Sequence, residues 1–370
     1  MLMDYFDAYA RRYDPYKNGA WCYEDGCVYR GLRLLHEATS EARWYDHLKR
    51  LVDLQVSPDG TIAGYRVDEY NIDNILSGRA LIYLHEVTGE ARYMQAAKLL
   101  GEQLAKHPRT KAGGYWHKKT YPWQVWLDGL YMGLPFQIEL GQATAEEALI
   151  EDALDQLSRA LDLTDGGDGL YVHGHDESRE QRWADSETGR SPAYWGRALG
   201  WLSMALVDVI DLVGLQRASV AGIAERTKAL LARIIELQTP TGLWLQVIDQ
   251  PDLPGNYEES SASAMFAYAL QKAGRLGLPV DGAVGRQALN RLVATRLVEG
   301  PAGVRFEGIC QVAGLGGFSG RYRDGTPDYY LTEPVVADDA KGVGPLMMAA
   351  AEAVSVSYGG SKKPVRASVG

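Results

Sequence analysis

The sequence repeats itself near its amino terminus. LHEATSEARWYDHLKRL, which begins at Leu35, resembles LHEVTGEARYMQAAKLL, which begins at Leu84, so the spacing is 84 − 35 = 49 residues. Each copy predicts the end of one helix, a short turn at Ser40 or Gly89, and a second helix with apolar residues at helical spacing. Because one helical hairpin cannot bury its apolar face alone, a repeat of this length predicts an array of stacked hairpins.

The rest of the chain continues this pattern of paired helices. Apolar periodicity predicts about twelve helices, or six hairpins. We expect these helices at residues 3–13, 27–38, 42–56, 74–87, 91–106, 126–141, 144–161, 193–213, 219–238, 259–273, 282–297 and 339–355. Those that start near 74, 126, 193, 259 and 339 are rich in Gly, Ala and Ser, which suits a tightly packed inner ring, whereas the helices between them carry more charge. The sequence thus predicts an all-α fold, built as an open solenoid or as a closed double ring.

Strand and linker signals are few. GLYVHG at 169–174 and GLWLQVID at 242–249 each predict a small hairpin inside a connection. No segment of residues 1–357 has the composition of a linker, so we expect one domain there. The remaining residues, 358–370, are polar, basic and rich in Gly and Ser, and we expect them to be disordered.

The charge and cysteine content narrow the class of protein. The 370 residues carry a formal net charge of −10, which argues against a nucleic-acid partner because phosphates require a basic surface. No stretch approaches the roughly 18 apolar residues of a membrane span, and Asp4 and Asp7 interrupt any signal-peptide core. Cys22, Cys27 and Cys310 are too few for a disulfide framework and predict a reducing compartment. We therefore expect a cytoplasmic protein without a membrane partner; the sequence does not predict its oligomeric state.

Tyrosine and tryptophan are frequent relative to phenylalanine, with 22 Tyr and 9 Trp against 5 Phe. Their flat apolar rings with a polar edge suit the faces of sugars. The same composition also fits an ordinary core built with amphipathic aromatic residues, so composition alone leaves both interpretations open.

The histidines separate into two groups. His36 and His85 occupy equivalent positions of the repeat, which predicts a structural role. His117, His173 and His175 lie outside the repeat, in two loops dense in Trp, Arg and acidic residues. Because each loop comes directly before an expected inner helix, we predict that both loops lie on one edge of the ring and carry function.

A metal centre is not expected. His173, His175 and Asp176 could be metal ligands, but their spacing matches no established ligand pattern. Cys22 and Cys27 have no second Cys or His pair at ligand spacing.

Two carboxylates are candidates for catalysis. Asp73 lies before or at the start of an expected helix, where it could act in catalysis or as the helix N-cap. Asp128 lies in the first turns of a helix that follows Pro122, inside the bulky segment WQVWLDGLYM. The helix dipole there favours the carboxylate, whereas burial among aromatic rings raises the pKa. We predict a raised pKa, with which Asp128 could act as a general acid near neutral pH, and two acids on an aromatic edge suggest glycosidase chemistry.

Four motifs give the chain a family resemblance. HKKTYPWQVWLDGLYM, SPAYWGRALGW, ESSASAMFAYAL and YRDGTPDYYLTEPVVADDAKGVGPLMMAA occur in this order. With them the chain resembles the unsaturated rhamnogalacturonyl hydrolases of glycoside hydrolase family 105 over nearly its whole length. The resemblance implies an (α/α)6 barrel, no metal or organic cofactor, and an oligosaccharide substrate whose non-reducing end is a 4,5-unsaturated uronic acid left by a lyase and linked to rhamnose.

The resemblance also implies a mechanism and a set of site residues. Water adds across the C4=C5 double bond rather than at the anomeric carbon, and the hemiketal that forms opens and releases the neighbouring sugar. Asp128 matches the aspartate that protonates C4, and Asp73 matches the family's second aspartate. The residues implied to bind substrate are His117, Lys118, Trp126, His173, Trp195, Arg197 and Trp201. His175 stands where family members often place an aromatic residue, and the loop at 316–325 is longer than usual.

Three alternatives remain open. Family 88 enzymes release unsaturated uronates from glycosaminoglycans by the same chemistry, and substrate preference depends on residues around the site. A sugar-binding toroid without activity is expected to lack Asp128 or Asp73, and both are present. A sugar epimerase of the same barrel type needs two histidine bases, which the acidic motifs fit poorly.

Overall fold

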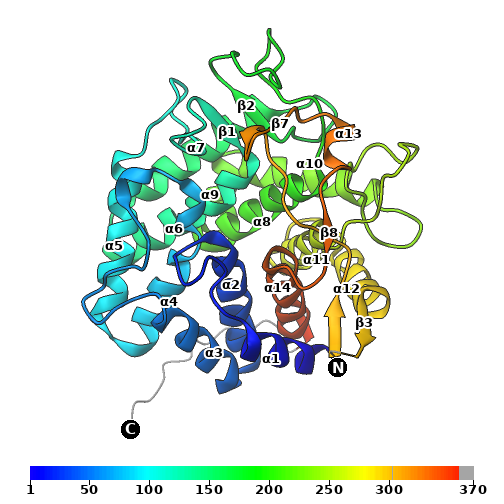
Figure 1. Cartoon of the computed structure of the whole chain (residues 1–370). Helices are drawn as coiled ribbons and strands as arrows, with labels where there is room; N and C mark the ends of the chain where they lie inside the picture. Colours follow the sequence, from blue (N-terminus) through cyan, green and yellow to red (C-terminus); the bar gives the residue numbers. More distant parts are fainter. Residues whose placement is uncertain (302, 358–370) are drawn as a thin grey trace.

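Two rings of helices, one inside the other, form the molecule (Figure 1). It is a computed structural model that describes residues 1–301 and 303–357. The inner ring consists of α2 (Tyr23–Thr39), α4 (Gly78–Thr88), α6 (Leu127–Thr144), α8 (Gly196–Val213), α11 (Ser260–Arg275) and α14 (Ala340–Ser357). The outer ring consists of α1 (Leu2–Arg12), α3 (Ala42–Asp53), α5 (Ala91–Lys106), α7 (Glu147–Thr164), α10 (Ile223–Glu236) and α12 (Gly282–Arg296). The tail at 358–370, expected to be disordered, lies outside the described residues.

Contacts between distant parts of the chain close the inner ring. Each inner helix packs against the next, from α2 through α4, α6, α8 and α11 to α14, and α14 packs back against α2. This last contact is close, because a Cβ atom on Gly344 of α14 would lie 2.4 Å from the backbone oxygen of Cys27 in α2. The fold is therefore the expected closed (α/α)6 barrel, and the open solenoid is excluded.

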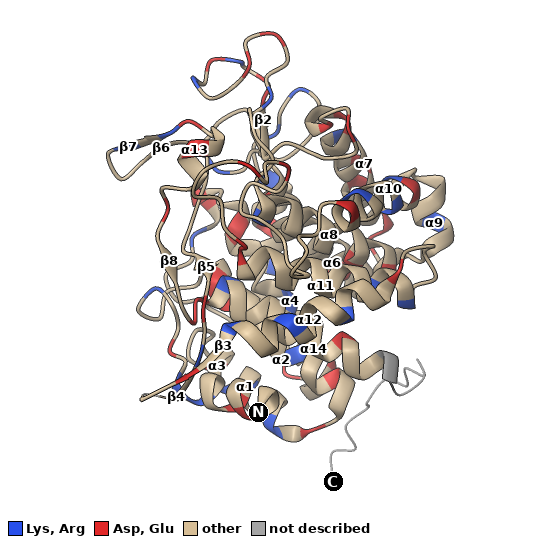
Figure 2. Ribbon diagram, turned by 90° about the vertical axis from the view of Figure 1, so that its right-hand side faces the viewer, with Lys and Arg blue, Asp and Glu red and all other residues tan. Residues whose placement is uncertain are grey.

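Burial distinguishes the two rings. Every residue of Gly196–Ile210 in α8 and of Ser260–Ala273 in α11 is buried, as expected of helices enclosed on all sides. The outer helix α3 instead buries a single stripe that includes Trp44, Leu48 and Leu51. Figure 2 shows the same division, because charged segments are more frequent on outer helices such as α10 and in the loops than along α6 and α8.

The pattern of small residues does not identify the first inner helix. α2 begins at Tyr23 rather than at residue 27, and it carries charges that the structure buries in pairs. Asp25 accepts hydrogen bonds from the hydroxyl of Tyr13 (2.7 Å) and the amide of Gln55 (2.9 Å). Because tertiary partners satisfy these charges, composition alone could not place this helix inside.

Buried charges tie five inner helices together. We call this group the buried charge cluster: Arg30 of α2, Arg79 of α4, Glu139 of α6, Asp208 of α8 and Lys272 of α11. Asp208 accepts hydrogen bonds from Arg79 (2.6 Å), Lys272 (2.7 Å) and Arg30 (3.2 Å). Glu139 accepts two from Arg79, each 3.1 Å. The cluster therefore links helices that are far apart in the sequence.

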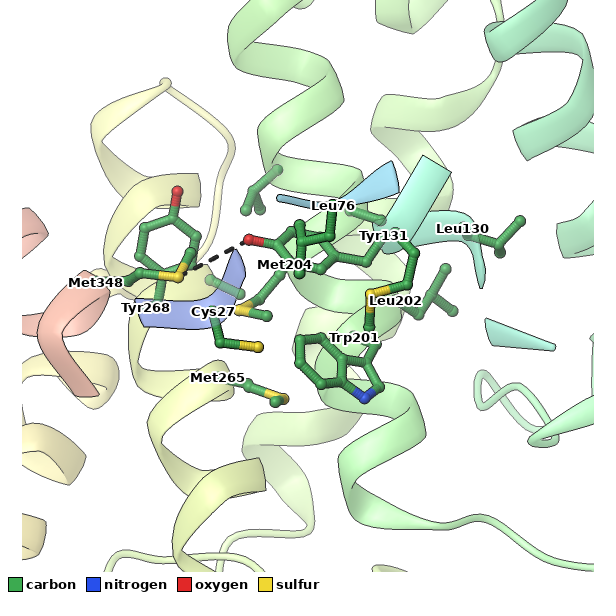
Figure 3. Packing of buried hydrophobic residues seen from close by; sticks show 14 of the residues in the cluster. Cys27, Leu76, Leu130, Tyr131, Trp201, Leu202, Met204, Met265, Tyr268 and Met348 are labelled. Carbon is green, nitrogen blue, oxygen red and sulfur yellow. Dashed lines mark hydrogen bonds between the residues drawn. The ribbon is translucent and has the colours of Figure 1, made fainter. Parts of the chain in front are cut away.

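Apolar and sulfur-containing side chains fill the space between the inner helices. Figure 3 shows Tyr131 of α6, Trp201 of α8 and Met348 of α14 packed together with Met265 of α11. The rings of Tyr131 and Trp201 stack with centres 5.4 Å apart, and the Tyr131 hydroxyl donates to the sulfur of Met348 at 3.8 Å. The barrel interior is thus a packed core at this level.

Short elements complete the connections. The helical ones are α9 (Leu215–Val220), α13 (Pro327–Tyr330) and two 3₁₀ segments, η1 (Val67–Glu69) and η2 (Ile72–Ile75). The antiparallel strand pairs are β1 (Gln124–Trp126) with β2 (Gly174–Asp176), β3 (Leu297–Gly300) with β4 (Gly303–Phe306), β5 (Ile309–Cys310) with β8 (Val335–Val336), and β6 (Gly316–Phe318) with β7 (Arg321–Arg323). No described helix has the length and apolarity that crossing a membrane requires. In Figure 1, β1, β2, β7 and α13 gather at the top end, and we call the loops there the rim.

The two expected hairpins form only in part. GLYVHG makes one isolated bridge, from Tyr171 to Asp165, and contributes Gly174 to β2, whose partner is the distant strand β1. GLWLQVID makes isolated bridges through Leu245 and Val247. Most of the apolar side chains of these segments are buried in the core, which holds the backbone away from a regular hairpin.

Candidate active site

The pairing of β1 with β2 brings two rim loops together at the start of α6. Trp126 lies opposite Gly174, and the amide of Leu127 donates to the carbonyl of His173 at 2.9 Å. This register places Nε2 of His173 3.1 Å from Oδ2 of Asp128. Apart from each other, neither of these two buried atoms has a hydrogen-bond partner in the described part of the chain.

The expectation of a raised pKa for Asp128 was wrong. Burial does raise its pKa, but the opposing charge and hydrogen-bonding capacity of His173, together with His117, outweigh burial and hold the pKa below its ordinary value. The sequence shows the bulky residues beside Asp128. The histidine that turns the expected rise of its pKa into a decrease comes from a loop about forty-five residues later. The side chain is 15% exposed, so it is open to a ligand from one side.

His173 is itself held in place by a tyrosine. Its Nδ1 lies 2.7 Å from the hydroxyl of Tyr330, and its ring lies between the rings of Trp126 and Trp195, with centres 5.4 and 4.9 Å away. Trp195 stacks on Tyr330 at 5.5 Å, and its indole donates to Gln246 at 3.1 Å. These contacts fix the orientation of the imidazole toward Asp128.

Asp73 does not cap a helix. Asn71 is the N-cap of η2, and its side chain accepts from the amide of Asp73 at 3.2 Å. The Asp73 carboxylate points instead to Lys118, 2.6 Å away, and to Nε2 of His117, 3.6 Å away. Burial lowers the pKa of Lys118, but Asp73 outweighs it and raises that pKa above its ordinary value. Asp73 and Lys118 therefore form a charged pair.

His117 lies close enough to both aspartates to be influenced by their charges. Burial lowers its pKa to about 4, against the raising effect of Asp73 and Asp128. Its ring stacks on Trp126 with centres 4.1 Å apart, and its Nδ1 is buried without a hydrogen-bond partner among the described residues. At neutral pH this histidine is therefore uncharged, and it is a neighbour of both carboxylates, Asp73 and Asp128.

Arg197 lies beside Trp195 and has guanidinium donors without a hydrogen-bond partner among the described residues. Its Nη1 donates to the hydroxyl of Ser261 at 3.2 Å and to the carbonyl of Cys310, and its guanidinium lies over the ring of Trp195 at 5.0 Å. Nε and Nη2 are buried and have no partner in the part of the chain that the structure describes. A buried guanidinium with two free donors is suited to a carboxylate.

Two tyrosines of the site were missed from the sequence. Tyr330 holds His173, as described above, and Tyr23 lies where the charges of Asp73 and Arg197 both act on its hydroxyl. Burial, Glu24 and Asp73 outweigh the opposing effect of Arg197 and raise the pKa of Tyr23 well above its ordinary value, so it stays a neutral hydroxyl. Tyr330 lies inside one of the four motifs, which was the available signal; nothing in the sequence around Tyr23 pointed to this position.

Three residues considered from the sequence make their contacts outside this group of site residues: Trp201, His175 and Asp176. Trp201 is 2% exposed and stacks on Tyr131 in the core, one helical turn beyond Arg197. The ring of His175 packs against Gly189, and Asp176 accepts hydrogen bonds from the amides of Ser178 and Gln181. Across the described residues, no group of three or more His, Cys, Asp or Glu side chains is arranged to hold a metal ion.

Comparison with known proteins shows which family the chain resembles over its length. The profile of Glycosyl Hydrolase Family 88 matches residues 3–357. Protein Atu3128 of Agrobacterium fabrum is 61% identical over 230 residues, which are 60% of this chain and 98% of that protein. The unsaturated rhamnogalacturonyl hydrolase YesR of Bacillus subtilis is 31% identical over 264 residues, 70% of this chain and 72% of that protein. A solved family 105 glycoside hydrolase from C. acetobutylicum is 37% identical, with a TM-score of 0.85, over 90% of this chain and 93% of that one.

Proposed function

The chain belongs to glycosyl hydrolase family 88, and from this we propose that it releases an unsaturated uronic acid from the non-reducing end of an oligosaccharide. The resemblance to family 105 is confirmed by the solved relative from that family. As a glycoside hydrolase, the protein is neither a sugar-binding toroid without activity nor an epimerase. The proposed substrate is an unsaturated galacturonyl-rhamnose fragment left by a rhamnogalacturonan lyase, a choice supported by the similarity to YesR.

The contact between Asp128 and His173 carries the proposal. A carboxyl group 3.1 Å from an oriented imidazole, where neither facing atom has another partner among the described residues, can deliver a proton to a bound substrate. The free donors of Arg197 supply a site for the uronate carboxylate on the same side of the barrel. The pair Asp73–Lys118 is placed to bind sugar hydroxyls.

Substrate binding can raise the pKa of Asp128 so that this side chain takes up the proton that the reaction needs. In the free protein its pKa is lowered, so the side chain is ionised near neutral pH. A bound uronate adds a negative charge beside it and removes water, and both effects raise the pKa of a carboxyl group. Asp128 would therefore take up a proton as the substrate enters.

The proposed reaction adds water across the double bond. Asp128 transfers its proton to C4, the oxygen of a water molecule bonds to C5, and the carboxylate takes a proton from that water. The hemiketal at C5 then opens to a ketone, leaving a hemiacetal at C1, and this loses the neighbouring sugar as an alcohol. One water is consumed, and Asp128 ends protonated as it began.

Trp126 and Trp195 contribute to the proposed site through their placement around His173. Both are buried, at 4% and 1% exposure, so they form its walls. The site assignment of Trp201 stays a prediction, because the residue lies in the core, where its ring stacks on Tyr131. Residues 1–357 are proposed to form one catalytic domain, supported by an apolar core that extends from Tyr5 to Ala351.

A cytoplasmic location also remains a proposal. Its support is that the three cysteines of the chain are all free and buried. No disulfide is therefore needed to hold the fold.

The test is loss of the ultraviolet absorbance of the conjugated double bond. Purified protein is mixed with the unsaturated galacturonyl-rhamnose disaccharide and, in parallel, with unsaturated glucuronyl disaccharides. We expect the absorbance to fall fastest with the rhamnose compound. Release of sugar with the absorbance unchanged would contradict hydration of the double bond.

Solvent deuterium distinguishes this chemistry from ordinary glycoside hydrolysis. A pair of carboxylates acting at the glycosidic bond leaves C4 untouched. Hydration through Asp128 instead forms a new C4–H bond with solvent hydrogen, so in D₂O the product should carry one deuterium at C4. Nuclear magnetic resonance of the product would detect it, and an unlabelled C4 would rule the mechanism out.

A further inference from the structure

The rim exposes a large apolar ring, that of Phe318, on a β-hairpin. Phe318 is 53% exposed, although apolar side chains of this size are mostly buried in the protein. It lies at the end of β6, beside a two-residue turn in which Ser319 and Gly320 both have positive φ, 50° and 77°. Such turns match the twist of the two strands, so the hairpin holds Phe318 in a defined place.

The two faces of this hairpin have different neighbours. Phe318 pairs with Arg321 and Gly316 with Arg323, so the side chains of Phe318 and Arg323 lie on one face, while Tyr322 lies on the other. Tyr322 docks on the loop after β2, where its hydroxyl accepts the amide of Trp183 at 3.1 Å. The face that carries Phe318 is therefore not the one that packs on this loop.

Arg323 packs its guanidinium against one face of the Phe318 ring. Its guanidinium lies 4.9 Å from the centre of the Phe318 ring, and its nitrogens donate to the carbonyls of Gly316 (3.2 Å) and Leu315 (2.9 Å). It is 6% exposed and forms no ion pair with any described carboxylate. One face of the Phe318 ring is thus occupied by the cation, and the ring's remaining surface accounts for its exposure.

The hairpin is continuous with the proposed active site. Tyr121 donates to the carbonyl of Gly317 at 3.4 Å and accepts from Arg323 at 3.0 Å. The ring of Tyr121 also stacks on Trp126, with centres 4.9 Å apart. Since Trp126 borders His173, an aromatic path leads from the reacting pair at Asp128 outward to Phe318.

We propose that Phe318, backed by Arg323 and continued by Tyr121, is the platform for the sugar that the reaction releases. The inference rests on the proposed function and adds to it a preference for one class of released sugar. The part of the Phe318 ring that Arg323 leaves uncovered is apolar and favours an apolar sugar edge, so the platform selects a 6-deoxyhexose, whose C6 is a methyl group, over the matching hexose. His175, which stands where family members often place an aromatic residue, has its ring against Gly189 and is not part of this platform.

Three substrates separate the parts of this proposal. The first is the methyl glycoside of the unsaturated uronate, which has no leaving sugar. The second is the disaccharide with a 6-deoxyhexose, and the third is the same disaccharide with a hydroxyl on C6. Each is assayed by loss of double-bond absorbance with wild-type protein, with Phe318→Ala and with Phe318→Leu.

We expect Phe318→Ala to lower the ratio of kcat/KM for the 6-deoxy disaccharide to that for the methyl glycoside by about tenfold, mainly through KM. It should also erase most of the preference over the C6-hydroxyl disaccharide, and Phe318→Leu should restore part of it. The matched control is Val298→Ala, an exposed apolar residue (41%) on the β3–β4 hairpin, which should change neither ratio.

The outcomes distinguish the platform from the function. Unchanged ratios in Phe318→Ala, or an equal loss on all three substrates, would overturn the platform while the hydration chemistry stands. A wild-type protein that leaves the double bond of the methyl glycoside and of both disaccharides intact would overturn the proposed function, and the platform with it.

Discussion

At the scale of single residues, the balance between burial and nearby charges sets the protonation of the site, and the balance differs from residue to residue. Asp128 lies among bulky side chains, yet His173 lowers its pKa. His117 shows the opposite balance, because the lowering effect of burial is larger than the raising effect of two nearby carboxylates, and its pKa falls to about 4. Each result depends on distances of a few ångströms that no sequence pattern specifies.

Asp128→Asn should abolish most activity and leave the fold intact. The amide is similar in shape but cannot carry the proton that goes to C4, and loss of a positioned acid costs at least about 10²-fold in rate. The measurement is kcat/KM for loss of double-bond absorbance, with a thermal melt followed by circular dichroism as the control for folding. Activity like that of the wild type would remove Asp128 from the mechanism.

Buried His107 should make stability fall on acidification. Burial and Arg109 lower its pKa to about 4, against a hydrogen bond between its Nε2 and the carbonyl of Trp116 at 2.8 Å. The folded pKa is below the unfolded value near 6.5, so between these values the unfolded chain binds more protons and stability drops as pH falls. The loss levels off below about pH 4 and amounts to at most about 3 kcal/mol.

The test compares wild type with His107→Gln by denaturant titration between neutral pH and pH 4.5. The variant should show a shallower decline in the free energy of unfolding, whatever its stability at neutral pH. Parallel curves for the two proteins would mean that His107 does not titrate in this way.

At the scale of elements, close approach between helices sets which positions must be glycine. α2 and α14 pack so closely at Gly344 that a Cβ atom would lie 2.4 and 2.5 Å from the backbone oxygen and carbon of Cys27. The obstruction is backbone, which cannot rotate aside as a side chain can. Gly274 near the end of α11 differs, since its nearest neighbour would lie at 3.4 Å, an ordinary contact.

Gly344→Ala should therefore destabilise the protein although alanine favours helices. Overpacking against a fixed backbone costs about 1–3 kcal/mol, more than the roughly 1 kcal/mol by which alanine is preferred in a helix. The matched variant Gly274→Ala should be neutral or stabilising. Thermal melts of both variants test this, and a stabilised Gly344→Ala would show that the two helices can separate at little cost.

At the scale of the whole molecule, the closed ring brings helix starts together at one end. Asp128 lies in the first turn of α6, Arg197 in that of α8 and Ser261 in that of α11, and Arg197 bonds Ser261 directly. Helix amino termini carry partial positive charge, which favours an anion such as a uronate. Deeper in the same ring, the buried charge cluster joins α2, α4, α6, α8 and α11.

Asp208→Asn should weaken the whole barrel. The substitution leaves Arg30, Arg79 and Lys272 facing an uncharged group inside the protein, and breaking a buried ion pair costs about 3–5 kcal/mol. The free energy of unfolding from denaturant titration is the measurement. Asp155→Asn is the control, because that side chain is 71% exposed and its ion pair with Arg159 is 3.7 Å long; a loss no larger than the control's would show that the cluster does not stabilise the fold.

The sequence by itself determined the class of fold and the family, and it supplied the candidates for the reacting groups. The repeat at Leu35 and Leu84 predicted helical hairpins because apolar periodicity is a local property, set by residues three or four apart. The four motifs identified the family, and with it Asp128 and Asp73. Helix positions were also predicted closely, apart from the earlier start of α2, the later start of α4 and the separate helix α9.

Only the tertiary structure decided how those residues work. Closure of the ring, the burial of α2 with its charges, the displacement of Trp201 into the core and the lowered pKa of Asp128 all depend on contacts between segments far apart in the chain. The pairing of β1 with β2 is the clearest case, since it carries His173 to within 3.1 Å of Asp128. Electrostatic effects fall with distance in space, and distance along the sequence does not reveal distance in space.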